Sequence, residues 1–176
     1  MKGTVLYQGP THQWLIFGRD PDKPEKIIDT NQFLIRAGSE AMLAEPGGIE
    51  LFPGMLRAVL DYVEIDQITA LFASHQDPDL ISSLGLWDNV LPRGTLYAPW
   101  MWEGFIRHFG CDNLQYEGIP DQGLTIHVGG LELQAIPAHF LHSSGNFNLY
   151  DPQARILMSG DLGMAIEPDQ QQASFF

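Results

Sequence analysis

Short runs of β-forming side chains, separated by turn residues, open the chain and predict antiparallel strands. The first pair flanks a Gly9-Pro10 turn and the second flanks Gly38-Ser39, which is the pattern expected of hairpins. The predicted pairs are Gly3–Gly9 with Gln13–Gly18, and Gln32–Arg36 with Ala41–Ala44. The chain is therefore expected to begin with four strands.

The middle of the chain changes to helical periodicity. Across Phe52–Tyr62, apolar residues recur at spacings of three and four, which predicts an amphipathic helix. A short apolar run at Ile68–Ser74 then indicates a buried strand. Two further helices are predicted, at Asp79–Trp87 and Trp100–Phe109.

The last part of the chain returns to strand patterns. A Gly129-Gly130 pair between two apolar stretches is the strongest hairpin signal in the sequence, and a second hairpin is predicted after it. These predicted strands are Leu124–Val128 with Leu131–Ile136, and Phe147–Tyr150 with Arg155–Met158. Strands, helices and again strands indicate an α/β domain with two sheets, and 176 residues suit one domain spanning 1–176.

Composition excludes several kinds of metal site and binding partner. A single cysteine, Cys111, excludes an intrachain disulfide and a cysteine-rich metal centre, so a bound metal would need His and carboxylate ligands. A net charge of −13 argues against nucleic acid or anionic membrane as a partner. No apolar run approaches the length needed to span a bilayer and no secretory leader is evident, so a cytoplasmic location is expected.

Polar clusters follow three of the predicted strands. They are His75-Gln76-Asp77-Pro78-Asp79, His139 with His142, and Asp161 within Ser159-Gly160-Asp161. Loops at strand ends are held by a rigid scaffold and converge on one point, the usual place for a site in an α/β fold. Each fragment alone also has a structural interpretation: Asp77 or Asp79 as a helix cap, His142 as a core histidine, Asp161 as a turn residue.

Taken together, the segment Ser74–Asp79, His142 and Asp161 resemble the ligand series of the metallo-β-lactamase superfamily. More narrowly, they are similar to the di-iron domain of flavodiiron proteins and of stand-alone oxygen-binding di-iron proteins. The likeness spans nearly the whole chain, including Glu45-Pro46-Gly47-Gly48 and Ala138–Ser143. It implies a metallo-β-lactamase-like αββα sandwich.

The resemblance also implies roles for individual residues. His75, Asp77 and His142 would bind one iron ion and Asp79 the other, with Asp161 bridging both. Hydrolytic members carry His where Asp77 stands, and a harder, anionic carboxylate there favours iron over zinc. Glu45 would hold the metal loop in place through a hydrogen bond. His139, three residues before His142, could support the ligands in the same way or could be a surface histidine.

Two departures from the family pattern affect the second ion. Leu80 stands where the family has a histidine, and leucine cannot donate to a metal. A further family histidine, well beyond Asp161, falls outside the 176 residues. We expect either a C-terminally truncated domain, which we favour, or a half-built site. Elsewhere, we expect His12 to lie at the surface and Trp100 in the core.

The leading functional hypothesis is a di-iron domain that binds dioxygen, for sensing or for reduction. Since no flavin-binding segment is evident, electrons for reduction would come from a redox partner, and a fused signalling domain or a homodimer is left open. An oxygen reductase would be an oxidoreductase, whereas a pure sensor would not be an enzyme. The alternatives are a zinc-dependent hydrolase of thioesters or esters, and a degenerate domain that holds no metal.

Overall fold

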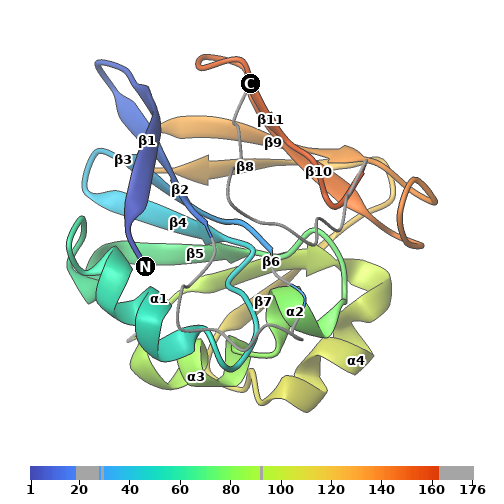
Figure 1. Cartoon of the computed structure of the whole chain (residues 1–176). Coiled ribbons are helices and arrows are strands. Elements are labelled where there is room, and N and C mark those ends of the chain that lie inside the picture. The colour runs from blue at the N-terminus through green and yellow to red at the C-terminus, as the bar shows by residue number, and fades with distance from the viewer. Residues whose placement is uncertain (19–27, 29, 92, 163–176) are drawn as a thin grey trace.

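The computed structural model describes residues 1–18, 28, 30–91 and 93–162. They form three layers: helices, a large sheet and a small sheet (Figure 1). The α/β class with two sheets is thus confirmed, and three layers of the expected αββα sandwich are present in this part of the chain. Residues 19–27, 29 and 92 and the residues after Leu162 lie outside the described part of the chain.

The large sheet has seven strands in sequence order, β1 to β7. Strands β1 to β4 are antiparallel neighbours, whereas β4, β5, β6 and β7 run parallel. The strands are β1 (Gly3–Gln8), β2 (His12–Phe17), β3 (Gln32–Ala37), β4 (Glu40–Ala44), β5 (Ile68–Phe72), β6 (Thr95–Pro99) and β7 (Gln115–Ile119). The parallel half matters for function, because the carboxyl ends of its strands meet at one edge of the sheet.

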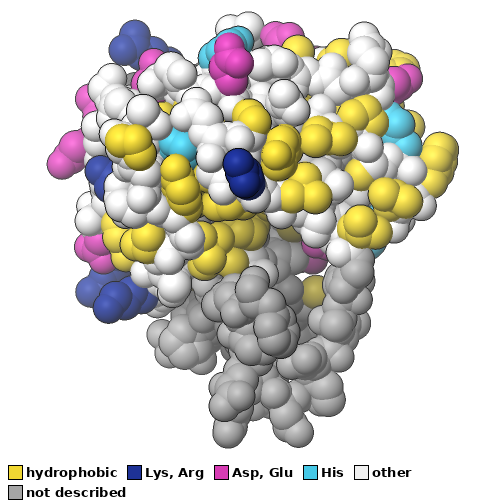
Figure 2. Space-filling model, turned by 90° about the horizontal axis from the view of Figure 1, so that it is seen from above, with side chains coloured by type: hydrophobic (Ala, Val, Ile, Leu, Met, Phe, Trp, Pro, Cys, Tyr) yellow, Lys and Arg dark blue, Asp and Glu magenta, His cyan; other side chains and the backbone are white. Residues whose placement is uncertain are grey.

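The small sheet is antiparallel, in the order β11-β10-β9-β8. Its strands are β8 (Leu124–Val128), β9 (Leu131–Pro137), β10 (Phe147–Asp151) and β11 (Ile156–Met158). Leu157 on its outer face is 54% exposed. Figure 2 looks onto this side of the molecule and shows hydrophobic side chains spread over it among polar ones.

All helices of the described chain lie on the outer face of the large sheet (Figure 1). They are α1 (Phe52–Val59), α2 (Pro78–Ile81), α3 (Leu84–Val90) and α4 (Glu103–Ile106), with 3-10 turns at Ile65–Gln67, Trp100–Trp102 and Arg107–Phe109. Within the described residues, no helix is both long and apolar enough to cross a membrane.

Two apolar clusters hold the layers together. The first, between helices and large sheet, is built around fully buried side chains such as Met55, Leu71 and Trp87. The second fills the space between the sheets, where Met42 and Phe72 meet Phe147. Alternate residues of the large sheet serve both clusters, since successive side chains of a strand point to opposite faces.

The structure corrects several sequence predictions. Strands β6 and β7 were not predicted. The helix expected over Asp79–Trp87 is divided into α2 and α3, and between them Ser83 donates its hydroxyl to the carbonyl of Gly47, 2.7 Å away. The helix expected over Trp100–Phe109 is one α-helical turn between two 3-10 turns, although it ends at a left-handed Gly110 as expected. Trp100 is 54% exposed, so its predicted core position is wrong.

His12 is buried, contrary to the prediction of a surface position. Only 4% of it is exposed, and its Nε2 lies 2.7 Å from Oδ2 of Asp151. The Trp14 indole donates to the same oxygen at 2.7 Å. Since His12 and Trp14 belong to β2 and Asp151 to β10, this cluster joins the two sheets across the apolar interior.

The Gly129-Gly130 turn meets the large sheet and provides a matched test of that contact. Both glycines have positive φ, but a Cβ on Gly129 would collide with the carbonyl oxygen of Ala37, whereas one on Gly130 meets nothing within 4 Å. We expect Gly130→Ala to cost about 1 kcal/mol of unfolding free energy through backbone strain, and Gly129→Ala roughly 1–3 kcal/mol more. Urea unfolding of both variants measures the difference, and equal costs would contradict the contact.

Candidate metal centre

The predicted ligand loops converge at one end of the two-sheet sandwich. Glu45 directly follows β4, and His75 follows the neighbouring parallel strand β5. From the other sheet, the loop before β10 carries His142, and the chain after β11 carries Asp161. The two sheets are tied together at this point, because the amide of Phe147 donates to the carbonyl of Ser74 at 3.1 Å.

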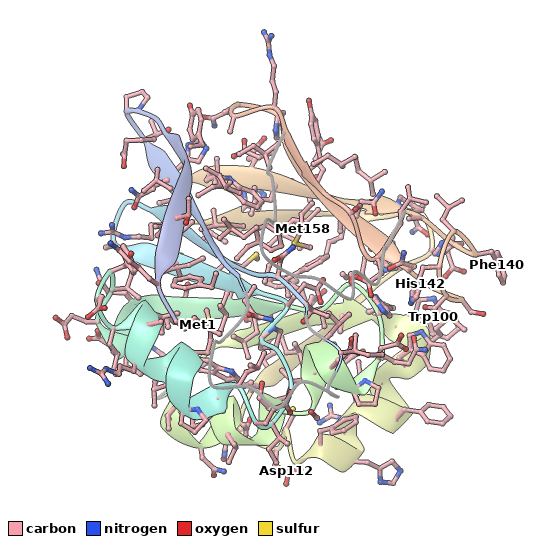
Figure 3. All side chains as sticks on the ribbon, viewed as in Figure 1. Met1, Trp100, Asp112, Phe140, His142 and Met158 are labelled. Atoms are coloured by element: carbon pink, nitrogen blue, oxygen red, sulfur yellow. The ribbon has the colours of Figure 1, made fainter. Side chains whose placement is uncertain are left out.

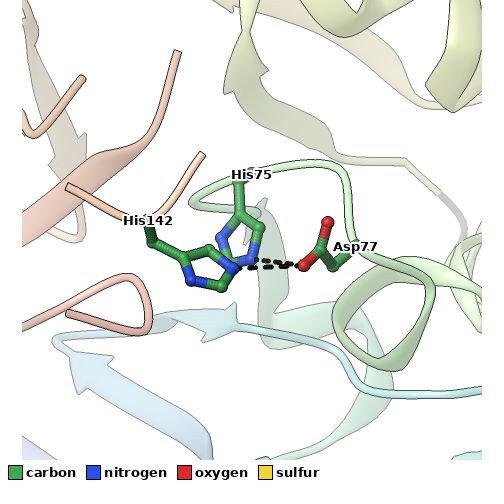
Figure 4. Close-up of side chains that lie close together, drawn as sticks. All are labelled: His75, Asp77 and His142. Carbon is green, nitrogen blue, oxygen red and sulfur yellow. Dashed lines mark hydrogen bonds and ion pairs between the residues drawn. The ribbon is translucent and has the colours of Figure 1, made fainter. Parts of the chain in front are cut away.

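Three of the predicted ligands form one cluster (Figure 4). Oδ2 of Asp77 lies 3.4 Å from Nε2 of His75 and 3.2 Å from Nε2 of His142. The two imidazole rings are 4.7 Å apart at an angle of 63°. One donor atom from each of the three residues lies within 4.8 Å of the others, so a single ion could contact all three.

Asp77 occupies the position that precedes α2, and Pro78 is the first residue of this helix. An aspartate at this position normally caps the helix, yet the Asp77 side chain makes no capping hydrogen bond. Its carboxylate is instead directed toward the two histidines, while Gln76 donates to the other carboxylate oxygen at 3.1 Å. The capping interpretation of Asp77 is therefore wrong.

Asp161 and Asp79 add negative charge beside this cluster. Oδ2 of Asp161 lies 3.8 Å from Nε2 of His75, and the backbone of Asp161 is left-handed, with φ of 59°. Burial raises the pKa of both carboxyls, and the charge of Asp77 raises each of them further. Carboxylates that oppose one another's ionisation in this way are stabilised when a cation lies between them.

His75 shows most directly that the site fits a metal ion. It is fully buried, and its Nε2 has no hydrogen-bond partner among the described residues. Its Nδ1 lies 2.8 Å from the Ser74 hydroxyl, and a hydroxyl that accepts from Nδ1–H leaves Nε2 with its lone pair. Burial also lowers the pKa of His75, which favours the neutral, metal-binding form.

Glu45 lies beneath the cluster and is 4% exposed. Its Oε1 accepts a hydrogen bond from the amide of Ser74 at 3.1 Å, so it braces the residue that precedes His75. Burial raises the pKa of Glu45 to about 8, and the charges of Asp161 and Asp79 act in the same direction. The backbone of Glu45 is left-handed, with φ of 54°, at the point where the chain leaves β4.

Glu45 gives the metal-free protein a defined pH dependence. Its folded pKa of about 8 exceeds the ordinary value of 4.5, so the folded protein keeps a proton that the unfolded chain loses. Stability contributed by this group therefore falls as pH rises from about 4.5 to 8, by up to ~1.4 kcal/mol per pH unit. Glu45→Gln should remove that slope in urea unfolding of chelator-treated protein. An unchanged slope would show that Glu45 ionises normally.

Two predicted residues, His139 and Leu80, lie away from the three-residue cluster. His139 lies 2.9 Å from the carbonyl of Asp121 through Nε2 and packs against the ring of Phe147, so its contacts hold the loop that leads to His142. Leu80 is buried in the apolar cluster between the helices and the large sheet.

Asn146 is a residue of the site that no sequence pattern indicated. Its side-chain amide donates to the carbonyl of Gly160 at 2.6 Å and so holds the backbone directly before Asp161.

The candidate site opens to solvent on the side of His142. The His142 side chain is 22% exposed, whereas that of His75 is not exposed. Figure 3 shows His142 close to Trp100 and Phe140 at this end of the molecule. Phe140 is 81% exposed, so apolar surface borders the open side of the site.

Comparison with solved structures gives close matches over nearly the whole chain. A structure of a peroxy diiron species of the chemotaxis sensor ODP matches with a TM-score of 0.82 and 33% identity, covering 99% of this chain and 70% of that chain. The apo state of the chemotaxis sensor ODP from T. denticola matches with a TM-score of 0.82 and 34% identity, covering 99% and 69%. No curated protein sequence matches the chain significantly.

More distant structures share the fold alone. The metal-soaked Flv1 flavodiiron core from Synechocystis sp. PCC6803 has a TM-score of 0.69 at 17% identity, covering 89% of this chain and 41% of that chain. A family model described as ODP family beta lactamase matches residues 28–176. The resemblance to the di-iron branch of the metallo-β-lactamase superfamily is thereby confirmed, and the chain belongs to the ODP family of beta lactamases.

Proposed function

We propose that this protein binds dioxygen at a non-haem di-iron centre. His75, Asp77 and His142 would hold the first ion, Asp79 would hold the second, and Asp161 would contribute to both. The observation that carries the proposal is the buried Nε2 of His75, which has no hydrogen-bond partner among the described residues and lies 3.4 and 3.8 Å from carboxylate oxygens of Asp77 and Asp161. A metal ion is the partner that this arrangement of donors fits.

The donor set favours iron. Two imidazoles and three carboxylates make a mixed, mostly oxygen site, and carboxylates stabilise both ferrous and ferric ions. The related structures include a peroxy diiron species of a chemotaxis sensor, which agrees with this assignment. The zinc-dependent hydrolase is not favoured, since neither the family match nor the carboxylate of Asp77 supports it.

The residues around the site have distinct tasks in oxygen binding. Ferrous ions supply the electrons that dioxygen accepts when it binds. Ser74 and Glu45 hold His75 in the orientation that directs Nε2 toward the centre. His142, which is partly exposed, lies where a small gas molecule enters from solvent. The buried side around His75 keeps bulk water away from the bound molecule.

We assign the protein to sensing rather than to catalytic reduction. Sustained reduction of dioxygen needs a supply of electrons from a redox partner. A sensor needs only reversible binding and a surface that reports it, and the related solved structures are of a chemotaxis sensor. A signalling partner is therefore part of this proposal, and it would read the oxygen-bound state.

Anaerobic reconstitution with ferrous iron followed by oxygen titration tests the proposal. Binding should produce a visible charge-transfer band that saturates near one dioxygen per two iron ions and decays when oxygen is removed. Metal analysis of protein made in iron- and zinc-replete cells is the companion measurement. Zinc without iron, or iron whose spectrum never responds to oxygen, would contradict the proposal.

A further inference from the structure

The two carboxylate oxygens of Glu45 have different surroundings. Oε1 accepts the hydrogen bond from the amide of Ser74 at 3.1 Å, which accounts for a bracing role. Oε2 is buried and has no hydrogen-bond partner among the described residues. A buried polar atom without a hydrogen-bond partner is destabilising, and such an atom calls for an explanation. The hydrogen bond to Ser74 accounts for Oε1 of Glu45 but not for Oε2.

The unpaired Oε2 belongs to a side chain that lies against the ligand loops. Ser74, whose amide donates to Oε1, directly precedes His75. Asp161 and Asp79, the two carboxylates assigned to the second ion, act electrostatically on Glu45. A cation held among these buried carboxyl groups would offset the cost of leaving Oε2 without a partner.

The second ion lacks one ligand, because Leu80 stands where a donor is expected. Glu45 lies on a neighbouring loop. Leu80, at the position where a donor is expected, is 2% exposed and packs in the apolar cluster with Ile81 and Leu84. The amide of Gly47, two residues after Glu45, donates to the carbonyl of Leu80 at 2.7 Å, so the two loops lie side by side. The carboxylate of Glu45 can therefore bind an ion to which the loop of Leu80 supplies one ligand too few.

We propose that Glu45 is an oxygen ligand of the second ion and takes the coordination position that Leu80 cannot fill. This inference rests on the proposed di-iron centre. Glu45 then has two simultaneous roles: Oε1 braces the loop that carries His75, and Oε2 binds metal. Glutamate suits both roles, because its side chain is one methylene longer than that of aspartate.

Anaerobic titration of the metal-free chain with ferrous iron, and in parallel with Co(II), tests the role of Glu45. In the unaltered protein two ions should bind. Glu45→Gln keeps the shape of the side chain and one acceptor. It should lower the affinity for the second ion roughly 10–100-fold and change the affinity for the first ion little. Glu132→Gln, at an exposed position on β9, is the matched control.

The outcomes separate this inference from the proposed function. Fewer than two ions in the unaltered protein would contradict the di-iron centre itself. Two ions bound equally well by Glu45→Gln would contradict only the ligand role. Weaker binding of the first ion as well as the second in Glu45→Gln would show that Glu45 merely braces the loop. If Glu45→Gln does not fold, the carboxyl carbon resonance of Glu45 in labelled protein decides, since it should shift with the second equivalent of Zn(II) and not the first.

Discussion

Asp77→Ala is expected to abolish binding of the first metal ion. The Asp77 carboxylate lies between two imidazoles, at 3.4 and 3.2 Å, so its removal leaves His75 and His142 without the anionic ligand they share. An ion present at a thousand times its dissociation constant stabilises the fold by about 4 kcal/mol, and the variant should lose that stabilisation. Metal analysis, together with thermal unfolding before and after chelation, measures the effect.

The control for this prediction is Asp61→Ala, an exposed aspartate beyond the end of α1. It removes the same charge from the protein and should leave both metal content and the chelator-induced shift in Tm unchanged. Metal content in Asp77→Ala equal to that of the unaltered chain would refute the ligand assignment. Loss of metal in both variants would instead point to a general effect of net charge.

Asp151→Ala should be strongly destabilising although it lies outside the metal cluster. Oδ2 accepts from the Trp14 indole and lies 2.7 Å from His12, while Oδ1 accepts from the amides of Gln153 and Ala154. Alanine leaves the buried His12 and Trp14 groups unpaired between the two sheets. Removing one member of such a buried pair costs about 3–5 kcal/mol, which urea unfolding should show.

Asp151→Asn distinguishes loss of charge from loss of hydrogen bonding. The amide keeps an acceptor for the Trp14 indole, so its cost should be smaller than that of alanine. Glu132→Ala, on an exposed position of the neighbouring strand, should change the unfolding free energy by less than about 0.5 kcal/mol. A cost for Asp151→Ala as small as that of Glu132→Ala would mean that the cluster does not join the sheets.

The metal cluster was predictable because its signal is chemical and local. His75, Asp77 and Asp79 follow an apolar run, which alone is a weak signal, and the likeness to known ligand motifs linked them to His142 and Asp161. The structure brings His75, Asp77 and His142 within contact of a common ion. Their assignment as iron ligands remains a prediction, which the titrations described above test.

Contacts between distant segments could not be predicted from the same patterns. His12 has no neighbouring motif, and the partner that buries it, Asp151, is 139 positions away and resembles any turn aspartate. Strand β7 contains Glu117 and Gly118, and it lacks the continuous apolar run that revealed β5. Tertiary pairing along β6 stabilises that strand, and local propensity alone gives no sign of it.

The tie between Phe147 and Ser74 has a consequence for how the protein is made. Four of the six proposed ligands, Glu45 included, lie in the first half of the chain, whereas His142 and Asp161 emerge from the ribosome long after them. A nascent chain that ends before His142 would hold, of these ligands, only carboxylates and one imidazole, which bind divalent ions weakly and unselectively. Selective loading with iron is therefore expected after translation has passed Asp161, when the second sheet docks onto the first.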